Sequence, residues 1–164
     1  MQKVRTPKAF LQFCLAGLLT ETSKVTGCCW VWDVMYRFLS YEAKMLDPTQ
    51  QARYLKIKDT IAAVGPSRMA VLDVGCGTAN GFQVWNDLDI DCFHGIDVSD
   101  AAIQTARKAC APGSANAPRH VHFVATTMEE YEPVGRKFDV IIFNEVLLLL
   151  PRPDGGVQED TQTA

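Results

Sequence analysis

The chain has 164 residues, of which 48% are hydrophobic and 21% charged, and its formal net charge is -3. These values are typical of one globular domain with a core of useful size. They argue against binding to nucleic acid, which normally requires a basic domain or patch.

Six cysteines are spread along the chain without a Cys-x-x-Cys pair, and the three histidines do not fall at zinc-binding spacings beside them. His120 and His122 alternate along a predicted strand and share a face, but no third metal ligand is evident in the sequence. We therefore expect no metal site. The cysteines instead predict reduced thiols, several of them buried, in a cytoplasmic compartment.

Residues 1–29 are expected to be an N-terminal helix or a poorly ordered leader. Three basic residues precede an apolar run at residues 9–19, which is too short and too interrupted to span a bilayer. The same pattern is found in targeting presequences, so a mitochondrial location is the alternative to a cytoplasmic one.

Residues 30–46 are rich in aromatic and aliphatic side chains at helical spacing, which predicts a helix that packs in the core or covers a pocket. Asp47 and Pro48 are a helix-start signal, and the next helix is expected to end at Gly65. The side chains expected on its buried face are Tyr54, Ile57, Ile61 and Val64.

Strands and helices then alternate along the chain. The predicted strands are residues 69–74, 92–98, 121–125 and 138–143, and the predicted helices are residues 81–88 and 100–110, with Ser99 capping the second. Alternation of this kind predicts right-handed βαβ units and an α/β fold with a doubly wound, Rossmann-like parallel sheet. A ligand of such a sheet binds beyond the carboxyl ends of the central strands.

The first predicted strand runs into the turn Gly75-Cys76-Gly77, and Gly-x-Gly turns let a ligand approach the backbone closely. Asp97 ends the second strand 20 positions after Gly77, which is the spacing of an acid that accepts hydrogen bonds from ribose hydroxyls. Asn80 stands where a dinucleotide-binding turn needs a third glycine. A cofactor without a pyrophosphate is therefore favoured over NAD.

Three segments in this order resemble the motifs of class I S-adenosylmethionine-dependent methyltransferases that act on small molecules. They are Asp73 to Gly77, Gly95 to Ser99, and Phe138 to Leu147. The resemblance covers residues 30–151 and implies a methyltransferase-like domain with S-adenosylmethionine as its cofactor. The segment from Trp32 and Asp33 to Tyr36 is similar to the N-terminal helix that often covers the cofactor in small-molecule members.

The resemblance also implies roles for individual residues. Asp73 and the glycine turn would line the methionine part of the cofactor, Asp97 would bind the ribose, and Ile96 or Val98 would lie near the adenine. Thr127 departs from the acidic residue that many members carry there, although the backbone of Met128 could serve. Asn144 would face the methionine amino group, and Glu145 would complement the sulfonium charge. The expected cofactor-binding set is Asp73, Gly75, Cys76, Gly77, Asp97, Val98, Thr127, Met128, Asn144 and Glu145.

The sequence nominates neither a catalytic base nor an acceptor, beyond favouring a small molecule over nucleic-acid adenine. The family's fold has seven strands, whereas this sequence predicts four and then a disordered tail at residues 152–164. The sheet is therefore expected to be incomplete, with its fourth strand as an exposed edge through which chains self-associate. Two functions follow: a methyltransferase, or an inactive module that binds a cofactor or a partner.

Overall fold

The computed structural model describes residues 29–39, 41–110, 118, 120–133, 135–144 and 146. Residues 1–28 of the leader predicted at residues 1–29, residues 111–117 and the predicted tail at residues 152–164 lie outside the described residues. Within the described part of the chain, no helix is long and apolar enough to cross a membrane.

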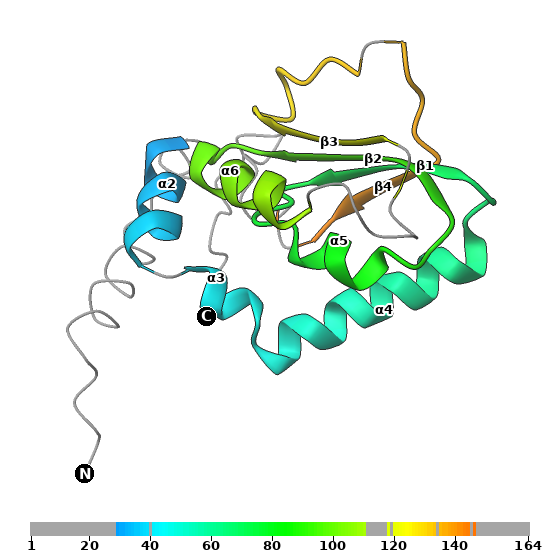
Figure 1. The fold of residues 1–164 in the computed structure, drawn as a ribbon, viewed down its shortest axis with the longest axis horizontal. Helices are drawn as coiled ribbons and strands as arrows, with labels where there is room; N and C mark the ends of the chain where they lie inside the picture. Colours follow the sequence, from blue (N-terminus) through cyan, green and yellow to red (C-terminus); the bar gives the residue numbers. More distant parts are fainter. Residues whose placement is uncertain are drawn as a thin grey trace, which may run out of the picture.

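The four described strands form one parallel sheet in the order β3-β2-β1-β4. The bounds are β1 Met69–Val74, β2 Ile90–Asp97, β3 His120–Ala125 and β4 Val140–Phe143. The order and the parallel pairing confirm the predicted α/β fold with a Rossmann-like sheet. All four strands end at the same edge, because their directions agree (Figure 1).

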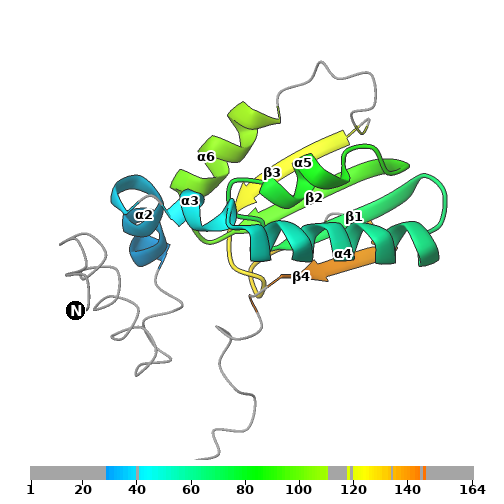
Figure 2. The same ribbon diagram turned by 90° about the horizontal axis from the view of Figure 1, so that it is seen from below.

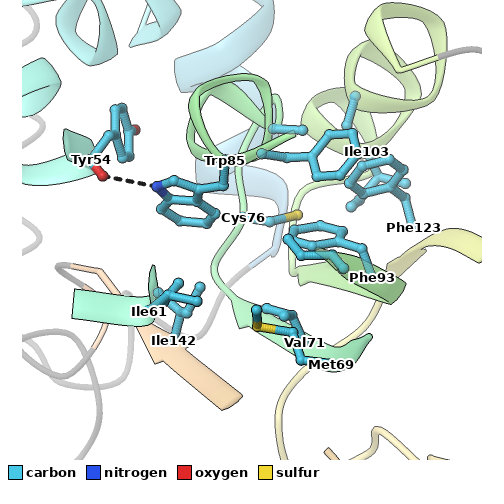
Figure 3. Packing of buried hydrophobic residues seen from close by; sticks show 14 residues of the cluster. Tyr54, Ile61, Met69, Val71, Cys76, Trp85, Phe93, Ile103, Phe123 and Ile142 are labelled. Atoms are coloured by element: carbon cyan, nitrogen blue, oxygen red, sulfur yellow. Dashed lines mark hydrogen bonds between the residues drawn. The ribbon is translucent and has the colours of Figure 1, made fainter. Parts of the chain in front are cut away.

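Three helices cover one face of this sheet, as Figures 1 and 2 show from two directions. They are α4 Pro48–Val64, α5 Asn80–Trp85 and α6 Asp100–Ala109. The core between them and the sheet is aromatic and aliphatic (Figure 3). Trp85 is fully buried there and its indole N–H donates to the backbone carbonyl of Tyr54 over 2.8 Å. Because the ring is buried and its N–H is hydrogen-bonded to α4, Trp85 holds α5 against α4.

The opposite face carries a smaller cluster of Leu72, Val74 and Ile96. The connection between β3 and β4 crosses this face, drawn in yellow to orange in Figure 1. Its side chains Tyr131 and Phe138 pack against the cluster.

Local signals in the sequence located the helix starts well. The Asp47 carboxylate accepts from the N–H of Thr49 over 2.8 Å, and the Ser99 hydroxyl accepts from the N–H of Ala102 over 3.2 Å. Both predicted caps are therefore confirmed, and the N–H of Gly65 closes the end of α4.

Other expectations were less accurate. Residues 30–46 form two helices, α2 Cys29–Phe38 and α3 Tyr41–Met45, rather than one. Val64 is 75% exposed, so its predicted burial is wrong: it lies in the last turn of α4, beyond the sheet-facing Ile61. Helix α5 ends at Trp85 instead of residue 88, and the N–H of Leu88 turns back to the Trp85 carbonyl. The strand predicted at residues 138–143 begins only at Val140.

Candidate functional site

The turn after β1 has the backbone that only glycine adopts readily. Gly75 has φ +74° and Gly77 has φ +55°. A Cβ on Gly75 would collide with the side chain of Val146, and a Cβ on Gly77 would lie 2.6 Å from the hydroxyl of Tyr36. Glycine is therefore needed at both positions, because the backbone has a positive φ and because side chains of other segments lie where a Cβ would be.

Asp97, the last residue of β2, ties this turn to the neighbouring strand end. One carboxylate oxygen accepts from the N–H of Gly77 and the other from the N–H of Ser99, each over 2.9 Å. Burial raises the pKa of Asp97, although these two backbone donors act in the opposite direction. Asp97 therefore joins the glycine turn directly to the end of β2, a contact that the sequence did not predict.

Asp73 is buried within β1, between Gly95 of β2 and Ile142 of β4. Burial, and then the charge of Asp97, raise its pKa to about 8. Below that pH the side chain is a neutral acid. A cation brought next to it would favour the ionised form.

Cys76 places its thiol in the core rather than at the sheet edge (Figure 3). A Cβ on Gly95 would lie 2.8 Å from the sulfur, so the missing side chain of Gly95 makes room for it. Burial raises the pKa of the thiol well above its usual value, with the charges of Asp73 and Asp97 adding to the effect. Any contact of Cys76 with a ligand therefore has to come from its backbone.

The remaining predicted residues follow the other strand ends. Val98 is half-buried directly after β2, and the N–H of Thr126 donates to the Asp97 carbonyl over 2.9 Å, which places Thr127 beside it. Met128 is 39% exposed. Asn144 is half-buried after β4, whereas the prediction for Glu145 lies outside the described residues.

Two residues of α2 that were not in the expected cofactor-binding set also reach the site, although the resemblance implied that their segment covers the cofactor. The hydroxyl of Tyr36 lies over Gly77, and burial, with the nearby Asp97, raises its pKa well above the usual value. Asp33, one turn earlier, accepts hydrogen bonds at the start of α6. The sequence signal for Asp33 was that it is the one acidic residue of this helix. Among the described residues, no group of three or more His, Cys, Asp or Glu could hold a metal ion.

Comparison with known proteins agrees with this geometry. A family model described as a methyltransferase domain matches residues 66–160, which is more than half of the chain. No curated protein matches the sequence.

Two solved structures share the fold. The chain is similar to the plantazolicin methyltransferase BpumL in complex with SAH, with a TM-score of 0.55 and 21% identity over 80% of this chain and 49% of that one. It is also similar to the plantazolicin methyltransferase BamL in complex with a triazolic desmethylPZN analog and SAH, with a TM-score of 0.50 and 20% identity over 77% of this chain and 47% of that one. The chain therefore spans about half the length of these two proteins.

Proposed function

The chain belongs to the methyltransferase domain family, and we propose that it binds S-adenosylmethionine beyond the carboxyl ends of β1 and β2. The observation that carries the proposal is the contact between Asp97 and the N–H of Gly77. This hydrogen bond joins the glycine turn to Asp97, the acid that we propose binds the ribose. Each carboxylate oxygen has a second lone pair, which leaves Asp97 able to accept from two ribose hydroxyls.

The residues at the strand ends fit such a cofactor. Gly75 and Gly77 present backbone without side chains, and Asp73 supplies a buried acid whose pKa is about 8. We propose that Asp73 faces the ammonium group of the methionine part, and that Val98, Thr127 and Met128 line the adenine side. The backbone of Cys76 and the strand end at Asn144 and Glu145 would complete the site.

The proposed reaction is methyl transfer to a small-molecule acceptor. When bound, S-adenosylmethionine would supply a methyl group on a positively charged sulfur, and an acceptor atom would take that methyl as the sulfur–carbon bond breaks. This chain would hold the two reactants in line, which can supply much of the acceleration. A base is needed only for an acceptor that must lose a proton.

Calorimetric titration with S-adenosylmethionine and with S-adenosylhomocysteine tests the cofactor site. Asp97→Ala removes two charged acceptors, so we expect affinity to fall about 100-fold, from roughly 1.5 kcal/mol for each hydrogen bond. Asp97→Asn keeps one acceptor oxygen and should lose less, in case the alanine variant does not fold. Asp59→Asn, on the exposed side of α4, is the matched control.

Proton release gives the same titration a second readout. If an ammonium group pairs with Asp73, binding near pH 7 must release a proton, and the apparent enthalpy will then depend on the ionisation enthalpy of the buffer. Asp73→Asn should remove that dependence. Failure of the folded, monodisperse wild-type chain to bind either compound, or binding of NAD in their place, would contradict the proposal.

A second candidate, a module that binds a partner through β4, is favoured by two exposed side chains. Ile141 is 53% and Phe143 37% exposed, on the outermost strand of the described sheet. We propose that this edge pairs with a second copy of the chain. Sedimentation velocity should show a dimer that Ile141→Lys reduces to a monomer, whereas a wild-type monomer at all concentrations would refute it.

We also propose a cytoplasmic location. Cys76, Cys92 and Cys110 are free thiols in the described part of the chain, as proteins of reducing compartments generally have.

A further inference from the structure

Helix α2 contacts the start of α6 through two side chains: Arg37 lies 4.0 Å from the carboxylate of Asp100, and Asp33 makes the hydrogen bonds. Oδ1 of Asp33 accepts from the hydroxyl of Ser99 over 2.7 Å and from the N–H of Ala101 over 3.0 Å. Burial acts to raise the pKa of Asp33, but these two hydrogen bonds, with the charge of Arg37, lower it. Asp33 is therefore ionised at neutral pH, as suits an acid beside the N-terminus of a helix.

The same helix brings a second side chain to the glycine turn. Tyr36 is three positions after Asp33, so both lie on one side of α2. While Asp33 contacts Ser99, the Tyr36 hydroxyl lies over Gly77.

Asp97 joins the two contact points. Its carboxylate accepts from the N–H of Gly77 and from the N–H of Ser99. Asp97 thereby connects the glycine turn, the end of β2 and the start of α6. Helix α2 contacts this connected unit at Ser99 and at Gly77. Figures 1 and 2 show α2 beside the N-terminal end of α6, at the edge where the strands end.

We propose that Asp33 is a positioning residue: its bonds to Ser99 and Ala101 hold α2 in place, so that the Tyr36 hydroxyl covers the ligand at the Gly77 turn. The inference rests on the proposed cofactor site, but it concerns a contact that also exists without ligand. An opposing possibility is that Tyr36 blocks the turn and must leave before a ligand binds. If Tyr36 covers the ligand, removal of the Asp33 carboxylate weakens binding. If Tyr36 blocks the turn, the same change strengthens binding.

The first test needs no ligand. Amide hydrogen exchange of the free chain, read by mass spectrometry, should be faster in α2 and in residues 75–79 of Asp33→Ala than in wild type, by about five-fold or more. The matched control is Asp47→Ala, which also removes a capping carboxylate, but from α4. It should speed exchange at the start of α4 only. Unchanged exchange in α2 of Asp33→Ala would overturn the inference, whether or not the chain binds S-adenosylmethionine.

The second test measures affinity for S-adenosylhomocysteine by calorimetry. Asp33→Ala should bind about ten-fold more weakly, which is ~1.4 kcal/mol, while Asp47→Ala binds as wild type does. Asp33→Asn retains an acceptor oxygen and should recover most of the affinity. In the Tyr36→Phe background, Asp33→Ala should weaken binding by much less than ten-fold, because the Tyr36 hydroxyl that Asp33 positions is already absent.

The outcomes separate the two claims. Wild type that fails to bind while Asp33→Ala exchanges faster in α2 refutes the cofactor site and leaves the positioning role standing. Equal affinity of wild type and Asp33→Ala refutes the role of Asp33 alone. Tighter binding by Asp33→Ala identifies Tyr36 as a block and also overturns the inference.

Discussion

The two faces of the sheet are built from different chemistry. The helix-covered face is dry and aromatic, with Val71, Phe93 and Trp85 fully buried. The opposite face mixes a few aliphatic side chains with histidines: His94 is hydrogen-bonded through Nδ1 to the Tyr131 hydroxyl, and its ring centroid lies 5.2 Å from that of His122.

The difference shows in the titratable groups of each face. Asp73, on the helix-covered face, has its pKa raised to about 8 because it is wholly buried. His94, on the other face, is only partly buried, and its pKa is lowered by burial, then by His122 and Arg136. The helix-covered face therefore supplies most of the stability and a strongly perturbed acid at the site, whereas the other face supplies a weaker and more solvated packing layer.

The largest expected effect comes from opening the core of the helix-covered face. Trp85→Ala leaves a cavity and removes the indole hydrogen bond to the Tyr54 carbonyl, and should lower the free energy of unfolding by about 3–5 kcal/mol. Ile141→Ala, on the other face, should cost roughly 0.5 kcal/mol, because its side chain is already 53% exposed. Urea unfolding followed by circular dichroism measures both. Equal losses would show that the helix-covered face does not contribute more to stability than the other face.

The next effect is the pH dependence that Asp73 imposes. Its pKa is about 8 in the folded chain and 3.8 for an ordinary aspartate side chain, so between these values the folded chain holds a proton that the unfolded chain has lost. Stability should therefore fall as pH rises through this window, by about 1.4 kcal/mol per pH unit from this group.

Asp73→Asn should flatten this part of the profile and raise stability at pH 7.5. Thermal unfolding from pH 5 to 8 measures it, with Asp59→Asn as the control that keeps the wild-type slope. A wild-type profile that rises over this range would mean that Asp73 is paired with a cation rather than held neutral.

Much of this fold could be predicted because its signals are local. The apolar strand at residues 69–74 and the caps at Asp47 and Ser99 depend on near neighbours in the sequence, and all three are confirmed. The parallel sheet followed from the alternation of strands and helices along the chain.

What could not be predicted depends on contacts between distant segments. Asp33 and Ser99 are 66 positions apart, and no local rule connects them. The Cys76 thiol lies in the core only because Gly95 of the next strand leaves space. The spacing of the glycine turn and Asp97 predicted an acid that binds ribose, but it did not predict the hydrogen bond from the N–H of Gly77.

The smallest expected effect lies on the face opposite the helices. In the folded chain the pKa of His94 lies below the ordinary histidine value of 6.5, so the unfolded chain takes up the proton first as pH falls. The contribution of His94 is then fully present above pH 6.5 and is lost as pH drops below it. His94→Gln should remove this loss in unfolding experiments between pH 7.5 and 5.5, while His120→Gln, an exposed neighbour on β3, should keep it.

Tyr131→Phe tests the contact that lies over His94. At pH 7.5 it should lower the free energy of unfolding by about 1 kcal/mol, the usual loss for one partly buried hydrogen bond. The Cys92 thiol and the Arg136 guanidinium also lie on this face and are unaltered by the change. A loss as large as that of Trp85→Ala would show that the connection between β3 and β4 carries as much of the stability as the helices do.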